Sequence, residues 1–233
     1  MAFRSALVSM ANVADAMRSP TRSFDRQTAS GALPPGAEDN PTRQRILLAG
    51  IELFGGRGYH GTTIRDIAAA AGLQSASLYS HFASKEAILA ELVFVGHDVH
   101  HRILLTALLE AGPDPRDQLR SVIRAHVSSH CRYPKLAMVS NHERHHLSPE
   151  ALAPALALRQ RSEYVATEIV VRGTDQGVFD VPNFRAAVTA LGSLGLSVTA
   201  WYPEHADGMT PEDVGDAYAE IALRIVGAAA PTA

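Results

Sequence analysis

Several features that would mark a particular class of protein are scarce in this chain of 233 residues. It has one cysteine, Cys131, which cannot form an internal disulfide and fits a reducing compartment. No uninterrupted apolar run approaches the roughly 18 residues of a membrane-spanning helix. The stretch before Thr21 is low in apolar content and carries Asp15, which argues against a secretory signal. We therefore expect a cytoplasmic protein without membrane contact.

Charge of one sign is also scarce. The formal net charge is −3, and residues 42–93 hold five basic and four acidic side chains, so this segment carries +1 and the remainder −4. Charge by itself therefore gives no signal for nucleic acid. Hydrophobic residues make up 46% of the chain, an ordinary share for a folded globular protein.

The alternation of apolar and polar residues that is typical of β-strands is scarce as well, and we expect an all-α fold. Asn40 before Pro41 is a helix start signal, and it opens a long series of helical patterns. Helices are predicted over residues 41–54, 64–71, 75–81, 85–110, 115–129, 134–145, 149–174, 183–201 and 211–226. Residues 1–40, rich in Ser, Ala, Gly and Pro, are predicted to form a disordered arm with a short helix near Leu7–Met17.

One motif match points to an enzyme. His142, Glu143 and His146 form a literal HExxH, which in zinc peptidases places two metal ligands one helical turn apart with a glutamate base beside them. The extended form of the motif fails, but Glu163 or Glu168 could supply a third ligand. A zinc hydrolase therefore stays open as an alternative function.

Histidine pairs give a second alternative. His97 with His101 and His126 with His130 are both spaced by four residues, and Cys131 adjoins the second pair. Such pairs could hold Zn, Ni or Cu in a metal-responsive regulator. Eleven histidines in a chain of this length make chance pairs common, so no metal ligand is assigned.

A polar segment after Gly72 matches a different mechanism. Two short predicted helices joined by a turn at Gly72 form a helix-turn-helix, whose second helix enters the major groove of DNA. The apolar positions that would hold the two helices together are Ile67, Ala68, Ala71, Leu73, Leu78 and Phe82. The positions left facing outward are Gln74, Ser75, Ala76, Ser77, Tyr79, Ser80 and His81. Small hydroxyl residues allow the protein backbone to approach DNA closely, and Gln can pair with adenine.

Residues 42–92 closely resemble the DNA-binding domain of the tetracycline-repressor (TetR) family of bacterial transcription regulators. The motifs that carry the resemblance are RQRILLA at 43–49, LFGGRGYHGTT at 53–63, IRDIA at 64–68, LY at 78–79, HF at 81–82 and SKE at 84–86. The resemblance implies a helix-turn-helix DNA-binding domain over 41–88 and a ligand-binding and dimerisation domain over 89–228. It also implies a homodimer, an inverted-repeat operator and a repressor released by a small effector, with neither catalytic activity nor a cofactor.

The resemblance also implies roles for individual residues. Thr63, Tyr79 and Lys85 are similar in position to phosphate contacts, and Arg43 could contact the DNA backbone or the minor groove. The implied groove-facing set is Gln74, Ser75, Ala76, Ser77 and His81. Ser80 departs from the family pattern, in which Tyr or Asn is common at this position, and it bears on which bases are contacted.

The C-terminal half is loosely similar to a subgroup that senses acyl-CoA thioesters. Its motifs include SVIRAH at 121–126, RSEY at 161–164 and PEDV at 211–214. This similarity implies an acyl-CoA effector, with Arg161 as the contact for an anionic group and with Tyr164 and His126 as further ligand-binding residues. The last two long helices, 183–201 and 211–226, are expected to form the dimer interface.

Overall fold

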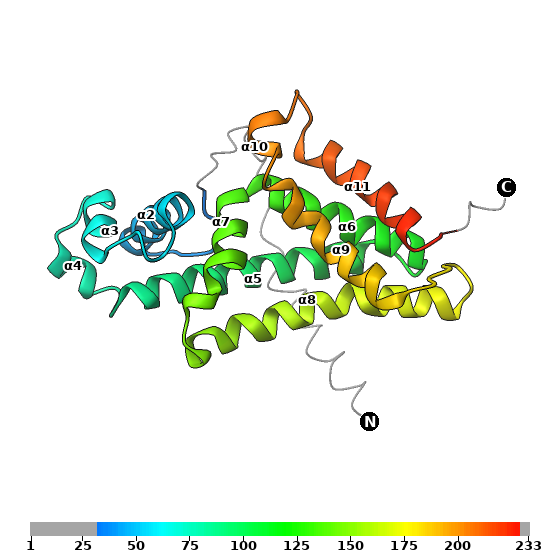
Figure 1. Ribbon diagram of the computed structural model, residues 1–233, viewed down its shortest axis with the longest axis horizontal. Coiled ribbons are helices and arrows are strands. Elements are labelled where there is room, and N and C mark those ends of the chain that lie inside the picture. Colours follow the sequence, from blue (N-terminus) through cyan, green and yellow to red (C-terminus); the bar gives the residue numbers. More distant parts are fainter. Residues whose placement is uncertain (1–31, 229–233) are drawn as a thin grey trace.

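The computed structural model describes residues 32–228, apart from the side chains of 204 and 205, and this part of the chain is helical without strands (Figure 1). Its α-helices are α2 (Pro41–Arg57), α3 (Ile64–Ala70), α4 (Ser75–Tyr79), α5 (Lys85–Glu110), α6 (Pro115–Arg132), α7 (Pro134–Met138), α8 (Pro149–Asp175), α9 (Phe184–Val198), α10 (Tyr202–His205) and α11 (Pro211–Ile225). The prediction of an all-α fold is confirmed. The expected helix near Leu7–Met17 lies outside the described residues.

Helices α2, α3 and α4 lie together at one end of the molecule, and α5 runs from that end into the larger helical body (Figure 1). Capping residues set where these helices begin. The Asn40 side chain accepts hydrogen bonds from the backbone of Thr42 and Arg43 at the start of α2, and the Ser84 hydroxyl accepts one from Ala87 at the start of α5. Each cap is therefore encoded by the residue just before the helix.

Two hydrophobic cores correspond to the two ends of the molecule. The first joins α2, α3 and α4 to the beginning of α5, and its fully buried side chains include Ile46, Phe54, Ile67, Leu78 and Leu92. The second surrounds α6, which packs against α5, α8, α9 and α11, and includes Leu119, Ile169, Leu191 and Val214. Helix α5 contributes to both cores, so it connects the two ends mechanically.

Helix α5 is long and apolar enough, by length and composition alone, to cross a membrane. Core helices of folded domains pass the same test. In this structure α5 packs against α2, α6 and α8, which accounts for its apolar composition.

The predicted helix over 134–145 is wrong in its second half. After α7 the chain forms a π-helix, η1 (Val139–Glu143), and then a 3-10 turn, η2 (Arg144–His146). Here η1 presses closely on α5: the Ser140 hydroxyl donates to the Leu92 carbonyl at 3.3 Å, and a Cβ built on Gly96 would lie 2.1 Å from Ser140 Oγ. Wide helical turns of this kind often occur at functional sites.

The segment just before α2 packs on the fold. Leu33 lies against the first core, Pro34 is buried, and the Glu38 carboxylate is 2.5 Å from Arg43 Nε. The expected disordered arm therefore does not extend through residues 33–40, because apolar contacts and an ion pair hold this segment. The rest of that arm, residues 1–31, lies outside the described part of the chain.

Candidate nucleic-acid interface and effector cavity

The turn between α3 and α4 has the geometry of a helix-turn-helix. Thr63 caps α3 in a reciprocal capping box with Asp66, and the hydrogen bond from the Thr63 hydroxyl lowers the pKa of that carboxyl group. Gly72 adopts φ = +68°, a left-handed conformation that favours glycine, and lets the Leu73 N–H bond back to the Ala68 carbonyl at 2.8 Å. The chain thereby leaves α3 and enters α4 within a few residues.

Helix α4 turns an apolar side inward and a polar side outward. Leu78 is completely buried and Phe82 is nearly so. Tyr79 is 52% exposed, and the outward set around it consists of the exposed Gln74, Ala76, Ser77 and Ser80 with the partly exposed Ser75 and His81. The Gln74 side chain makes no capping bond, so its amide is available to a base edge. This arrangement is compatible with the predicted DNA contacts, which remain predictions.

Arg43 and Lys85 make internal contacts that the sequence did not indicate. Arg43 donates to the His81 carbonyl at 3.0 Å and lies over the Phe82 ring, in addition to its ion pair with Glu38. It thereby braces the loop after α4. Its predicted role as a direct DNA contact would require a change in these bonds.

Lys85 closes the turn after α2 in a similar way. Its ammonium group donates to the carbonyls of Tyr59 and Thr62 at 2.6 and 2.8 Å and lies 3.9 Å from the centre of the Tyr59 ring. Its predicted phosphate contact would compete with these bonds. Arg45 and Arg65 are better placed for phosphates, because both are exposed and neither forms an ion pair within the described residues. The count of charged side chains in residues 42–93 could not show that Arg45 and Arg65 are exposed.

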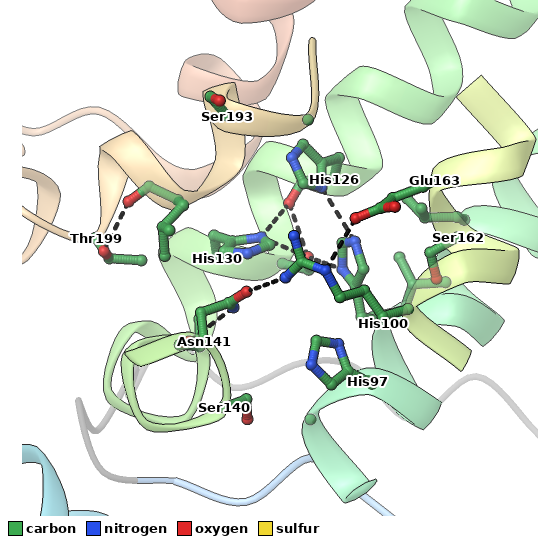
Figure 2. Close-up of a pocket in the computed structure, with 18 of the residues that line it drawn as sticks. His97, His100, His126, His130, Ser140, Asn141, Ser162, Glu163, Ser193 and Thr199 are labelled. Atoms are coloured by element: carbon green, nitrogen blue, oxygen red, sulfur yellow. Dashed lines mark hydrogen bonds and ion pairs between the residues drawn. The ribbon is translucent and has the colours of Figure 1, made fainter. Parts of the chain in front are cut away.

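A cavity of about 690 Å³ lies in the larger helical body, between α5, α6, η1, α8 and α9 (Figure 2). Part of its wall is apolar, including Ile103, Leu104, Val122, Ile123, Leu191 and Leu196. Polar side chains form the rest, and Figure 2 shows His97, His100, His126, His130, Asn141 and Glu163 grouped around the space. A cavity of this size and composition suits a compact amphipathic molecule.

The ligand-binding residues expected on α8 lie elsewhere. Arg161 is exposed and Tyr164 is 62% exposed, and neither lines the cavity. Residues two positions apart on a helix point roughly 200° apart, and it is Arg159 that faces inward. Arg159 bonds to Asn141 at 2.9 Å and to Glu163 at 2.9 Å. The predicted His126 does line the cavity.

Burial holds four histidines of the cavity wall uncharged. Burial lowers the pKa of His97 to about 4 and that of His126 to about 3, and it also lowers the pKa values of His100 and His130. Burial raises the pKa of the neighbouring Cys131 thiol to about 12, so it is no thiolate at neutral pH. The cavity therefore presents neutral imidazoles.

The structure gives no support to the zinc hydrolase that the HExxH motif left open. Because η1 and η2 replace a regular helix, His142 lines the cavity, whereas Glu143 and His146 turn towards the helix-turn-helix. Glu143 accepts a hydrogen bond from the Tyr59 backbone N–H at 2.9 Å, and the His146 ring stacks on the Tyr59 ring with centroids 5.2 Å apart. The motif thus supplies contacts between the two ends of the molecule. Ser148 adds another, because its N–H donates to the Glu86 carboxylate at 2.8 Å.

Comparisons with known proteins agree with this geometry. Residues 46–92 match the family model described as bacterial regulatory proteins of the tetR family, and residues 112–226 match a tetracyclin repressor-like C-terminal domain. The repressor KstR2 of Rhodococcus jostii is 45% identical over 64 residues, which is 26% of this chain and 31% of that protein. The chain thus spans about a third of the length of that curated relative.

Solved structures extend the likeness to most of the chain. A tetR-family regulatory protein from Rhodococcus RHA1 is 32% identical with a TM-score of 0.76, covering 82% of this chain and 100% of that one. AibR, solved with isovaleryl coenzyme A and operator DNA, shares the fold at 23% identity and a TM-score of 0.69, covering 81% and 100% of the two chains. These relatives are regulators, and none supports a hydrolase. The chain belongs to the TetR family of bacterial regulatory proteins.

Proposed function

We propose that this protein is a transcriptional repressor that binds an inverted-repeat operator as a homodimer and releases it when a small effector fills the cavity. The observation that carries the proposal is α4, whose polar side faces outward while Leu78 and Phe82 fix it from behind. Small polar side chains on a rigidly held short helix are suited to close contact with the major groove.

Contacts between the two ends of the molecule supply a route for regulation. In η1, Asn141 and His142 line the cavity, and the next residue, Glu143, holds the Tyr59 N–H. A ligand that displaces η1 would therefore act on the turn that leads into α3. Effector and operator affinities must then be coupled reciprocally.

For the effector, we propose an acyl-CoA thioester. The apolar wall suits an acyl group, and His126 and Arg159 line the same space. We place the acyl group in the cavity of about 690 Å³ and the nucleotide outside it. Exposed cationic groups on α8, such as Arg161, could contact its phosphates there. AibR, a protein of the same fold, was solved with such a ligand.

Homodimerisation is proposed through α9 and α11. Phe184 on α9 and Ile221 on α11 are 40% and 42% exposed, large apolar side chains that a partner helix pair would cover. Other apolar residues of these two helices, including Leu191, Val198 and Val214, are already buried within the chain. They stabilise the protomer and leave the outer positions for the partner.

Selection from random duplexes tests the proposal. The purified protein should enrich a palindromic sequence, and a mixture of long- and short-chain acyl-CoA thioesters should then lower its affinity for that duplex. Native mass spectrometry of the same sample should show two chains per operator. Enrichment of no palindrome would contradict operator binding, whereas a palindrome insensitive to every thioester would contradict only the effector class.

A further inference from the structure

Three histidine rings from two helices meet in the cavity wall. His100 lies on α5, whereas His126 and His130 lie on α6, and one nitrogen of each ring is within 4.8 Å of the other two (Figure 2). His100 Nε2 is 3.1 Å from His126 Nδ1. Two nitrogen ligands bound at 2.0–2.1 Å to one tetrahedral ion are roughly 3.4 Å apart. This pair of nitrogens therefore already has nearly the spacing of two ligands of one metal ion.

Each ring also has a partner for its second nitrogen. His100 Nδ1 is 3.2 Å from Ser129 Oγ, and His130 Nδ1 is 2.8 Å from the His126 carbonyl. For His126 the contact differs, because the Gly195 N–H lies 3.0 Å from its Nε2. Metal-binding histidines commonly donate their other N–H to a carbonyl or a polar side chain, which fixes the ring and its tautomer. His100 and His130 therefore already have the outer contact of such a site, whereas that of His126 depends on its tautomer.

We propose that His100, His126 and His130 bind a divalent transition-metal ion of the zinc type. Neutral imidazoles suit Zn²⁺, Ni²⁺ and Cu²⁺, and three histidines with one open position are an arrangement in which zinc accepts a further ligand. All three rings line the cavity, so the open position faces the space that the effector would occupy. This inference does not depend on operator binding.

A network of hydrogen bonds without metal is the competing arrangement. The Gly195 N–H lies 3.0 Å from His126 Nε2, and in the tautomer that accepts this bond the proton on Nδ1 prevents metal binding. With a metal on Nδ1, the proton moves to Nε2 and the bond from the Gly195 N–H is lost. The tautomer of His126 therefore distinguishes the two arrangements, and metal binding should change it.

The other histidine pair from the sequence does not form part of this site. His97 lines the cavity, but His101 does not, and its Nδ1 lies 3.2 Å from Ser162 Oγ on α8. His101 is next to His100 in the chain, so a His101→Gln substitution is a matched control. It changes a neighbouring imidazole and leaves the three proposed ligands intact.

Titration of the full-length, chelator-stripped protein with Co²⁺, followed by displacement with Zn²⁺, tests the proposal. We expect one Co²⁺ per chain, with the intense visible absorption of a four-coordinate ion. His130→Gln and His100→Gln should each weaken Zn²⁺ binding by at least about tenfold, and Ser129→Ala by about tenfold through the loss of an outer contact. His101→Gln should bind like the parent protein.

Two substitutions on different helices guard against misfolding. Circular dichroism shows whether His100→Gln or His130→Gln fails to fold. The Zn²⁺ affinity is then taken from the variant that does fold. The weak absorption of a six-coordinate cobalt ion would overturn the proposal, as would unchanged Zn²⁺ affinity in the folded ligand variants. When Zn²⁺ is added, nitrogen-15 chemical shifts should show that the His126 proton has moved to Nε2. An unchanged tautomer would also overturn the proposal.

Discussion

The carboxylate of Glu143 accepts a hydrogen bond from the backbone N–H of Tyr59, across 84 positions of sequence and at a distance of 2.9 Å. This bond joins a residue next to the cavity wall to the turn that leads into the helix-turn-helix. The two ends of the molecule are thus connected by a direct polar contact as well as through α5.

Removal of this carboxylate should loosen the connection. We expect Glu143→Ala to lower the free energy of unfolding by about 1–3 kcal/mol, because a partly buried N–H loses a charged acceptor. Glu143→Gln keeps an oxygen that can accept the bond, so its loss should be smaller. Chemical denaturation measures both. Equal stability of the parent protein and Glu143→Ala would show that the bond contributes nothing.

Two glycines on α9 form a matched pair. A Cβ on Gly195 would lie 2.5 Å from His126 Nε2, whereas a Cβ on Gly192 meets nothing within 4 Å. We expect Gly195→Ala to destabilise the protein by about 1–3 kcal/mol through overpacking. Gly192→Ala should stabilise the helix by about 0.5–1 kcal/mol, because alanine loses less backbone entropy. Thermal unfolding of both variants checks the prediction, and a similar effect of the two substitutions would contradict it.

Stability should fall in mild acid because of His97. Burial lowers its pKa to about 4, whereas the unfolded chain titrates near 6.5. Between these values the unfolded chain binds a proton that the folded chain does not, so the free energy of unfolding falls by about 1.4 kcal/mol per pH unit as the pH drops. Above this window the contribution is fully present.

The pH effect can be assigned by substitution. Urea unfolding in the presence of a chelator, between about pH 6.5 and pH 4, should show a shallower pH dependence for His97→Gln. His145 is exposed, so His145→Gln should keep the slope of the parent protein. Equal slopes in the two variants would mean that His97 is not responsible.

Substitutions in α4 should separate affinity from sequence preference. Tyr79→Ala should weaken binding to all duplexes alike, and Tyr79→Phe isolates the part due to the hydroxyl. Gln74→Ala should cost about 1–3 kcal/mol at particular base positions and relax the preference there. Binding assays on a panel of single-base operator variants test this. An unchanged preference for Gln74→Ala would place Gln74 away from the bases.

The dimer interface can be tested at its two exposed apolar residues. Phe184→Glu and Ile221→Glu should shift the protein from dimer to monomer, because a charge would be buried against the partner helices. Leu109 on α5 is 63% exposed and lies outside α9 and α11, so Leu109→Glu serves as the control. Light scattering after gel filtration gives the mass. A dimer retained in both α9 and α11 variants would contradict this interface.

Local signals in the sequence account for most of the helices. Capping residues such as Asn40, Thr63, Ser84 and Thr210 each precede a helix in the structure, because a side chain that satisfies free backbone N–H groups acts within a few residues. The polar outer side of α4 was predicted from the helical spacing of the apolar residues around it. The two buried positions, Leu78 in α4 and Phe82 just after it, follow from this spacing.

Long-range packing accounts for what the sequence did not indicate. The π-helical turn of η1 depends on its close contact with Gly96, which is 44 positions before Ser140. The inward side of α8 depends on how the helix rotates against its neighbours, and this places Arg159 rather than Arg161 at the cavity. The approach of His100 to His126 likewise depends on the packing of α5 against α6.

Pro34 also lines the cavity, although it precedes the helix-turn-helix in the chain. In topological terms, the DNA-binding segment is therefore an insertion between two stretches of cavity-lining polypeptide. The leading stretch reaches it through the ion pair of Glu38 with Arg43, and the trailing one through Glu143 and Tyr59. An occupant of the cavity would act on both ends of the inserted segment, and a deletion that removes Pro34 together with Glu38 would leave only the connection through Glu143 and Tyr59.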